Sequence, residues 1–541
     1  MARSCQRCIH RARRGLRAFT LVEMLIAMVL TLILVFAVAE FYAIVGDAVK
    51  DGRATIEMGG QLRAVVQRLK ADLDQLTIPV IPWTDEGAAS GYFEYFEGRG
   101  NDYEPFANFV PGSGPNMATG FSALATTSGV TNGLGDGDDF LAFTIRAAGQ
   151  PFTGRYEPAG ASAPTIINSQ LAEVIWWVGF EDRNGNNIWD EDEPRQLYRR
   201  QLLIRPDLTN IDNNAPYPSL QLAYQRLLQI WQSNDISLHI KPDLLSNAYR
   251  IVPNSLADLA RREHRFGHMP LLVSTSATMP PYLIDQTFPH SAVSLNPAQF
   301  PLLLPSFTAN SPGVQPPNPS QRTLVLTGTA MGEDVVLSNL LAFDVQAYDP
   351  YARVWPDNPG GQSQAALTPS DPGYRNILAA GNSSTLNATS LIGLGAYVDL
   401  NYYRYLPANA SIIDNTLTTT SGFPLPYYAG PPAVPQSLTA AAAATYLINF
   451  GYNTYPFGAT YDTWAFSYEK DGMDQLGTGT YDRATNGLDD DGANGVDDAR
   501  ERETVPPYPQ PLRGIRVRIR IYEPRTRQIR QATVEADFLR E

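Results

Sequence analysis

The stretch Arg17-Ala18-Phe19-Thr20-Leu21-Val22-Glu23-Met24-Leu25-Ile26 decides the architecture of this chain. The apolar run that starts here continues to Val45, and residues 24–39 carry no charge. With its flanks the run can cross a bilayer, which needs about 20 apolar residues. Arginines before the run and acids after it place the preceding segment in the cytoplasm and the following chain outside. The sequence therefore predicts a single transmembrane helix over residues 19–45.

Glu23 is an acid inside this apolar helix. A carboxylate at membrane depth costs roughly 2.5–3.5 kcal/mol on insertion scales, so it usually has a partner. Phe19 lies one helical turn before it. The alternative is that Glu23 merely lies at the level of the lipid headgroups.

The segment from Ala18 to Glu23 closely resembles the prepilin signal of type IV pilins and type II secretion pseudopilins. In that family a prepilin peptidase cuts just before the Phe and methylates the new amine. The acid at the fifth mature position then engages the terminal amine of a neighbouring subunit. The resemblance implies cleavage between Ala18 and Phe19, N-methylation at Phe19 and an assembly role for Glu23. The family normally has Gly before the cut, and Ala18 replaces it here with another small residue.

The segment before the cut differs in charge from the rest of the 541-residue chain. Residues 1–18 carry six Arg, no acid and both cysteines, Cys5 and Cys8. His10 follows Cys8 with Ile9 between them, so the haem-attachment spacing is absent, and the segment offers too few ligands for a metal. The remainder has 35 Lys and Arg against 55 Asp and Glu, a formal charge of -20. This balance argues against nucleic-acid binding, which needs a basic surface.

Beyond the membrane run, apolar residues recur at helical spacing, which predicts an amphipathic continuation of the stem over 46–78. We expect Pro79 and Pro82 to end this helix and the glycines within it to bend or fray it. The apolar stripe consists of Leu62, Val65, Val66, Leu69, Leu73 and Leu76, and the glycines are Gly46, Gly52, Gly59 and Gly60.

The sequence pattern of residues 79–541 predicts a β-rich head. Alternating apolar residues and β-branched runs mark the strands. Stretches rich in Pro, Gly, Ser and Asn near 285–322 and 356–440 predict surface insertions rather than additional core. The predicted strands are 140–145, 174–180, 196–204, 323–327, 340–348, 515–521 and a return strand containing Val534, Ala536 and Phe538.

Two smaller features of the head complete this prediction. The row Arg516, Arg518 and Arg520 on the last-but-one strand is interpreted as a solvated face. The run 440–444 predicts the start of a helix with Thr439 as its cap. The predicted fold class is α+β, with a long N-terminal helix packed on an antiparallel sheet, as in pilins.

Residues 182–193 fit a twelve-residue calcium loop, in which a crowd of hard oxygens surrounds the cation. The flanks are predicted strands, so the alternative is a metal-free hairpin turn rich in Asn and Asp. We favour calcium on the number of ligands. The proposed ligands are Asp182, Asn184, Asn186 and Asp190 at positions 1, 3, 5 and 9, the backbone carbonyl of Ile188, and Glu193 at position 12.

A second acidic run, 486–498, fits the same pattern less completely. Asp489, Asp491 and Asp497 take positions 1, 3 and 9, whereas Ala493 stands at position 5 and Arg500 at position 12. Either another segment supplies ligands, with Asp471 and Asp474 as candidates, or the run is a solvated turn. Clustered carboxylates repel one another, and a bound calcium ion would relieve that repulsion.

No catalytic motif is apparent in the sequence. His264 and His268 have helical spacing but lack the adjacent Glu of a zinc protease, so a surface pair is the simpler interpretation. A phosphate-binding loop and a Gly-x-Ser-x-Gly elbow are both absent from the sequence. A carboxylate pair of the glycosidase type stays open, because sequence alone does not reveal it. We expect a protein that is not an enzyme.

Three further features resemble the minor pseudopilin J family of type II secretion. These are a strand with a polar loop, the run Leu197-Tyr198-Arg199-Arg200, and the Arg-rich terminal hairpin. Minor pseudopilin K typically lacks the acid at the fifth mature position, so Glu23 favours J. The resemblance implies a structural tip component that assembles with the I, K and H minor pseudopilins and the major pseudopilin. It would prime a periplasmic pseudopilus that exports proteins across the outer membrane.

Two other functions stay open at this point. One is a minor pilin or adhesive tip subunit of a type IV pilus, which shares the same stem. The other is a periplasmic hydrolase tethered to the inner membrane by that stem.

Overall fold

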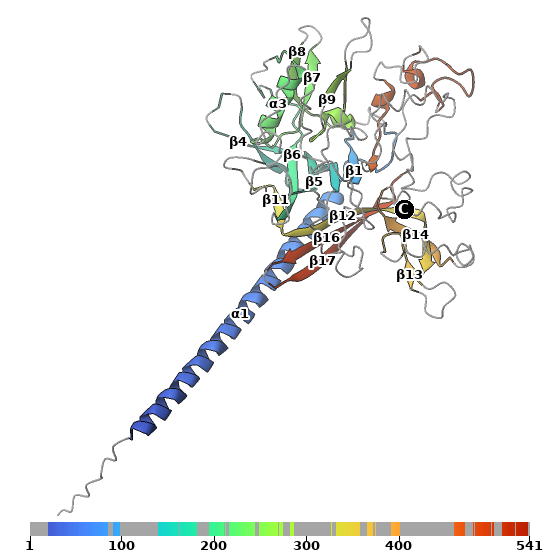
Figure 1. The fold of residues 1–541 in the computed structure, drawn as a ribbon. Helices are drawn as coiled ribbons and strands as arrows, with labels where there is room; N and C mark the ends of the chain where they lie inside the picture. Colours follow the sequence, from blue (N-terminus) through green and yellow to red (C-terminus); the bar gives the residue numbers. More distant parts are fainter. Residues whose placement is uncertain are drawn as a thin grey trace, which may run out of the picture.

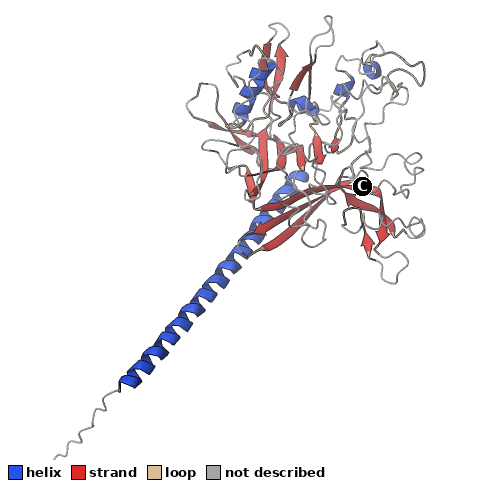
Figure 2. Ribbon diagram, viewed as in Figure 1, coloured by secondary structure: helices blue, strands red, loops and turns tan. Residues whose placement is uncertain are grey.

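A long helix projects from a β-rich head in the computed structural model (Figure 1). The structure describes residues 20–84, 90–97, 139–180, 194–273, 282–285, 326–357, 365–374, 391–400, 459–470, 480–502 and 511–538, apart from short gaps within several of these ranges. Strands dominate the head and helices are few there (Figure 2). The predicted α+β class is confirmed.

The projecting rod is α1 (Leu21–Leu73), a single helix of 53 residues. It runs through all four glycines without interruption. It ends at Leu73, before Pro79, so the prediction that the prolines end it was wrong. The chain leaves the helix because Leu76 forms an isolated bridge with Ile145 and the Thr77 amide donates to the Thr144 carbonyl at 3.0 Å.

The larger sheet has six strands in the order β11-β6-β5-β2-β1-β15, with every neighbouring pair antiparallel. Its centre is the pair β5 and β6, which form a hairpin in register from Ala172 opposite Leu203 to Phe180 opposite Arg195. The strands are β1 (Phe93–Glu97), β2 (Phe140–Arg146), β5 (Leu171–Phe180), β6 (Arg195–Leu203), β11 (Val335–Ser338) and β15 (Ala459–Asp462).

The second sheet lies beside the upper part of α1 (Figure 1). Its order is β13-β12-β16-β17, and β14 also pairs with β12. Residues Ile515, Val517 and Ile519 of β16 are fully buried, as the alternating pattern predicted. The strands are β12 (Leu340–Pro356), β13 (Ala366–Leu367), β14 (Gly393–Val398), β16 (Gly514–Glu523) and β17 (Gln528–Asp537).

The remaining elements form the far end of the head, opposite the stem (Figure 1). The hairpin of β7 and β8 packs there with α3, which Ser219 caps by accepting a hydrogen bond from the Leu222 amide at 3.3 Å. These elements are β3 (Phe152–Tyr156), β4 (Thr165–Ser169), α3 (Leu220–Trp231), β7 (Leu238–Asp243), β8 (Ala248–Pro253), η2 (Asp258–Ala260), η3 (Arg262–His264), β9 (Pro270–Val273) and β10 (Tyr282–Asp285), followed later in the chain by η7 (Phe466–Glu469) and η8 (Arg483–Thr485).

The six-stranded sheet separates two apolar cores. On β5, Val174 and Trp176 face the core shared with α1 and the second sheet. The alternate residues Ile175 and Trp177 face the core formed with α3 and β7. This alternation is the two-residue period of a strand buried on both faces.

Most predicted strands are confirmed, with adjusted ends. The exceptions concern the insertions. Residues 356–440 contain β14, whose Val398 is fully buried beside Leu400, so part of this insertion belongs to a core. Most of 285–322, all of 440–444 and all of the predicted strand 323–327 except Leu326 lie outside the described residues.

The arginine row of β16 is half-buried rather than fully solvated. Arg518 lies 3.4 Å from the carboxylate of Asp344, which is buried on the neighbouring strand β12. Arg516 donates to the side-chain oxygen of Gln346 at 2.6 Å. Strand pairing brings these acceptors opposite the arginines, and the sequence pattern did not reveal them.

Candidate functional site

The start of α1 is closed by a capping box between Thr20 and Glu23. The Glu23 amide donates to the Thr20 hydroxyl at 3.2 Å, and the Thr20 amide donates to the Glu23 carboxylate at 2.9 Å. This reciprocal pair satisfies two backbone donors that a helix start otherwise leaves free. Glu23 therefore sits in the first turn of the helix, whereas Ala18 and Phe19 lie outside the described residues.

The first part of α1 exposes its apolar side chains on all sides. An 18-residue window of this helix has a mean hydropathy of 2.8, and none of that window is buried. A core helix of a soluble protein would be mostly buried, so the exposure points to a membrane anchor near the N-terminus. The exposed side chains include Leu21, Val22, Met24, Leu25, Ile26, Met28, Val29, Leu30, Leu32, Ile33, Leu34, Val35 and Phe36.

The last part of α1 is held in the head by apolar and polar contacts. The buried Asp72 carboxylate accepts two hydrogen bonds from Arg199 of β6, at 2.7 and 2.8 Å, and one from the Trp176 indole of β5 at 3.0 Å. This bidentate pair fixes the helix against the centre of the six-stranded sheet. Arg199 belongs to the Leu197-Tyr198-Arg199-Arg200 run of the sequence.

The first acidic loop connects β5 and β6. The strand flanks predicted for it are confirmed, because the hairpin is paired as far as Phe180 and Arg195. Residues 181–193 themselves lie outside the described residues. They include all six proposed ligands, Asp182, Asn184, Asn186, Ile188, Asp190 and Glu193.

The second acidic loop gathers a ligand set that differs in part from the predicted one. One carboxylate oxygen each of Asp489, Asp491 and Glu501 lies within 4.8 Å of the other two. Asp497 lies outside this cluster and accepts a hydrogen bond from the Gly487 amide at 2.9 Å. Asp471 and Asp474 are outside the described residues.

Glu501 organises the second loop. Its side chain is buried and accepts hydrogen bonds from the backbone amides of Asp490, Asp491 and Asp498. Counting from Asp489, Glu501 stands one residue beyond the acidic position of the calcium pattern. The acid was present in the sequence, and allowing a shift of one residue would have found it.

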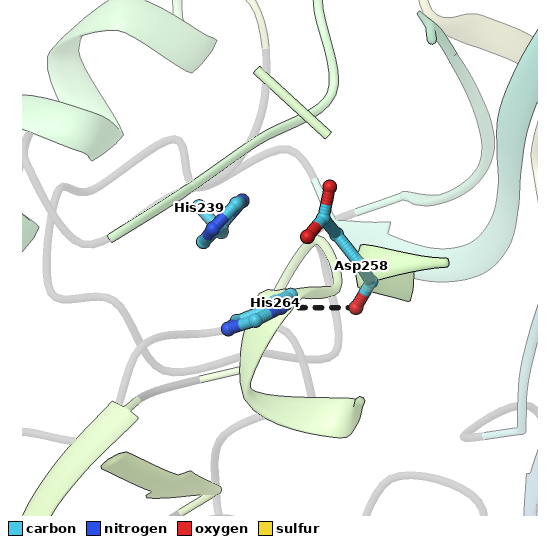
Figure 3. A group of neighbouring side chains, drawn as sticks. All are labelled: His239, Asp258 and His264. Atoms are coloured by element: carbon cyan, nitrogen blue, oxygen red, sulfur yellow. Dashed lines mark hydrogen bonds between the residues drawn. The ribbon is translucent and has the colours of Figure 1, made fainter. Parts of the chain in front are cut away.

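Figure 3 shows a second cluster of ligand-type side chains, carried by β7, η2 and η3. It consists of His239 on β7, Asp258 on η2 and His264 at the end of η3. One ligand atom of each lies within 4.8 Å of the other two. The two imidazole rings stack with centroids 4.0 Å apart. No sequence spacing signals this cluster, because separate elements supply its members.

Burial keeps both imidazoles of this cluster neutral. It lowers the pKa of His239 to about 3, with a further lowering from the neighbouring His264. Burial and the charge of Arg261 also lower the pKa of His264 to about 3. Burial by itself raises the pKa of Asp258, but the hydrogen bonds that its carboxylate accepts from Ser255 bring it below its ordinary value, and the charge of either imidazole lowers it further when that ring is protonated. The cluster therefore holds two neutral rings and one carboxylate at neutral pH.

His268 does not pair with His264 on the surface, so that interpretation was wrong. It is buried, and its Nε2 lies 3.1 Å from Glu94 of β1. The same carboxylate contacts Arg262 at 2.9 Å and Arg265 at 3.0 Å. The short η3 turn places the two histidines in separate networks, which α-helical spacing did not predict.

This second network joins the edge of the large sheet to η3. Arg262 and Arg265 also contact Asp462 of β15, at 3.1 and 3.0 Å. Burial alone raises the pKa of Glu94, but Arg262, His268 and Arg265 outweigh burial and lower that pKa well below its ordinary value. The charges are mutually paired, which is the arrangement of a structural ion cluster.

Comparison with known proteins identifies one family motif. The prokaryotic N-terminal methylation motif matches residues 13–39. No curated protein and no solved structure matches the chain. The matched region covers the predicted cleavage position, the capping box at Glu23 and the exposed apolar part of α1. The motif and the exposed apolar helix together indicate an N-terminal prepilin-type signal similar to that of type IV pilins and pseudopilins.

Proposed function

We propose that the chain is a minor pseudopilin of a type II secretion system, of the J type. In this role it is a structural tip component that primes the pseudopilus and has no catalytic activity. Its partners are the I, K and H minor pseudopilins, the major pseudopilin and the prepilin peptidase. The alternative within the same class is a minor pilin or adhesive tip subunit of a type IV pilus.

The observation that carries the proposal is the acid in the first turn of an exposed apolar helix. Glu23 lies within the methylation motif, and the side chains around it are unburied. A carboxylate at this depth gains from a cationic partner. The amine at Phe19 of a neighbouring subunit, released by cleavage after Ala18, supplies that charge. Glu23 would then set the register between subunits.

The proposed topology follows from charge. The arginines of residues 1–18 stay in the cytoplasm and the head lies in the periplasm. The helix holds the subunit in the inner membrane until it is extracted into the filament.

We also propose that both acidic loops bind calcium. The second loop supports this with carboxylates of Asp489 and Asp491 gathered beside the buried Glu501. Since a ligand of the folded state raises its stability, calcium should raise the thermal midpoint of the full chain and a chelator should lower it. An Asp489→Asn/Asp491→Asn variant should lose part of the shift, and an Asp182→Asn/Asp190→Asn variant another part. Identical melting with and without chelator would refute calcium binding.

Mass spectrometry of the mature N-terminus tests processing, with methylated Phe19 as the expected species. Variants then test assembly. Glu23→Gln keeps an oxygen that can accept the Thr20 hydrogen bond but removes the charge, and Glu23→Ala removes both. Glu40→Gln, an exposed acid at the other end of the apolar run, is the matched control. We expect both Glu23 variants, but not the control, to lose co-purification with the other minor pseudopilins.

Deleting the gene distinguishes the two candidate systems. Loss of secreted proteins from the medium with surface filaments intact supports the secretion role. Loss of surface filaments with secretion intact supports the pilus alternative. Normal export and assembly in a Glu23→Ala strain would refute the proposed role of Glu23 in either system.

A further inference from the structure

We propose that His239, Asp258 and His264 form a binding site for a divalent transition-metal ion, with zinc as the best match. The site lies in the head, far from the membrane helix (Figure 1). It shares no residue with either acidic loop. Two imidazoles and a carboxylate are ligands that zinc accepts, and calcium by contrast prefers oxygen ligands alone.

The hydrogen bonds around His239 determine which of its ring nitrogens is free. Its Nδ1 lies 2.7 Å from the side-chain oxygen of Asn254. The amide nitrogen of Asn254 donates to the Ser237 hydroxyl at 2.8 Å and to the His264 carbonyl at 2.9 Å, which fixes the orientation of the amide. Because the Asn254 oxygen only accepts, Nδ1 of His239 must carry the proton. Nε2 of the neutral ring is then an unprotonated lone pair.

The same reasoning applies to His264. Its Nδ1 lies 2.9 Å from the backbone carbonyl of Asp258, the bond drawn in Figure 3. A carbonyl oxygen only accepts, so Nδ1 donates and Nε2 again carries a lone pair. Binding of the second ring nitrogen to a carbonyl or amide oxygen is the usual support of a metal-ligating histidine.

Asp258 supplies a third acceptor. Its Oδ2 accepts hydrogen bonds from the amide and hydroxyl of Ser255, at 2.8 and 2.6 Å. Among the described residues, Oδ1 of Asp258 and Nε2 of both histidines take part in no hydrogen bond. The cluster thus holds three lone-pair atoms with no donor for them among the described residues. A cation satisfies all three at once.

The geometry needs a small closure to bind metal. Bonds of about 2.0–2.1 Å in a tetrahedral site place neighbouring ligand atoms roughly 3.4 Å apart, whereas here one ring nitrogen of each histidine and one carboxylate oxygen of Asp258 lie within 4.8 Å of one another. His264 and Asp258 are half-buried on short 3-10 turns, so rotation of their side chains can supply this closure. Binding would separate the stacked rings and tie β7 to η2 and η3. The nearby cation Arg261 is already paired with Glu263 at 2.8 Å.

The full chain, purified in detergent micelles, tests the proposal. Cys5→Ser and Cys8→Ser changes remove competing thiolates from residues 1–18. After chelator treatment, we expect one equivalent of tightly bound zinc and a higher thermal midpoint with zinc than with magnesium. Cobalt in place of zinc should give the visible absorption bands of a tetrahedral site.

Two variants of the cluster and one control locate the metal. His264→Phe keeps a ring stacked on His239 and removes both nitrogens, while Asp258→Asn keeps an oxygen for the Ser255 cap. Each should weaken zinc binding at least about tenfold, or about 1.4 kcal/mol. The control Asp489→Asn/Asp491→Asn should leave zinc binding unchanged. If His264→Phe does not fold, the zinc affinity of Asp258→Asn alone shows whether the cluster binds the metal. Three results would overturn the proposed site. These are the absence of zinc and cobalt binding, variants that bind zinc as tightly as wild type, and a loss of zinc binding in the control alone.

Discussion

The two halves of α1 differ in what surrounds them, although they form one helix. Before Met58 the apolar side chains point into open surroundings, and Leu30 is 60% exposed. From Met58 onward one stripe is buried, and Leu69 is completely inaccessible. The backbone is continuous across this boundary. Both halves therefore form helix, and the surroundings of each half determine whether its leucine side chains are exposed or buried.

The boundary also separates two kinds of polar contact. In the first half, the Glu23 side chain bonds, among the described residues, only to Thr20 at its own helix start. In the second half, Asp72 bonds to two strands of the head. Local hydrogen bonds shape the end that is available for assembly, and long-range ones anchor the end that is built into the head.

The largest expected effect comes from equal substitutions in the two halves. Leu69→Ala should destabilise the head by about 2–5 kcal/mol, because it removes a buried side chain and leaves a cavity. Leu30→Ala should leave head stability within about 0.5 kcal/mol of wild type, as for other exposed positions. Urea unfolding of the full chain in micelles, followed by tryptophan fluorescence, measures both. Equal losses would erase the distinction between the halves.

The polar anchor should have the next largest effect. Asp72→Ala leaves the Arg199 guanidinium and the Trp176 indole without their acceptor, at a cost of about 2–4 kcal/mol. Arg68→Ala is the control, because Arg68 is 53% exposed and lies 3.8 Å from Asp72. It should change stability by less than about 0.5 kcal/mol. The same unfolding assay measures both variants. An Asp72→Ala variant as stable as wild type would show that Asp72 does not anchor the helix.

Acidity should affect the sheet beside the embedded half. Burial, and then the charge of Asp399, raise the pKa of Asp344 to about 7 against the opposing effect of Arg518, Arg520 and Arg516. In the unfolded chain an aspartate titrates near pH 3.9, about three units lower. The folded state therefore keeps a proton that the unfolded state releases.

This difference has a definite sign. The contribution of Asp344 to stability should fall as pH rises from about 4 to 7 and then level off, by an amount on the order of a few kcal/mol. Asp344→Asn stays uncharged, so its stability relative to wild type should increase between pH 5 and pH 8. Unfolding at a series of pH values measures the two curves, and parallel curves would contradict the assignment.

Two helical glycines give the smallest and most specific test. Alanine is favoured over glycine in a helix by about 0.8–1.0 kcal/mol. At Gly59 this gain should appear in head stability, reduced because a new Cβ would lie 3.3 Å from the flexible end of Arg530. At Gly46 nothing lies within 4 Å, so we expect a change there to leave the unfolding of the head unaffected. Thermal melts of Gly46→Ala should match wild type, and a shift there would show that the two halves are coupled.

The sequence predicted the features that depend on local pattern. The apolar run, the helical stripe after it and the alternation of Ile515, Val517 and Ile519 each identified an element correctly. The position at which α1 ends was predicted wrongly, because Leu76 forms a β-bridge with Ile145 instead of continuing the helix. The sequence did not predict the burial of residues in 356–440, because that burial depends on the pairing of β14 with β12. A local sequence pattern does not reveal this pairing.

The candidate sites divide in the same way. The prepilin segment and Glu23 were found because they are contiguous in the sequence. Glu501 was missed by one residue of spacing. His239 and Asp258 were missed because a strand and a separate turn bring them to His264.

The sequence by itself determined the stem, since helix formation and hydrophobicity depend on residues three to four positions apart. It also determined the prepilin signal and the alternation of the strands. Only the tertiary structure decided where α1 enters the head, which arginines of β16 meet acids, and which histidines meet one another. Those contacts join residues distant in sequence, and strand register sets them rather than spacing along the chain.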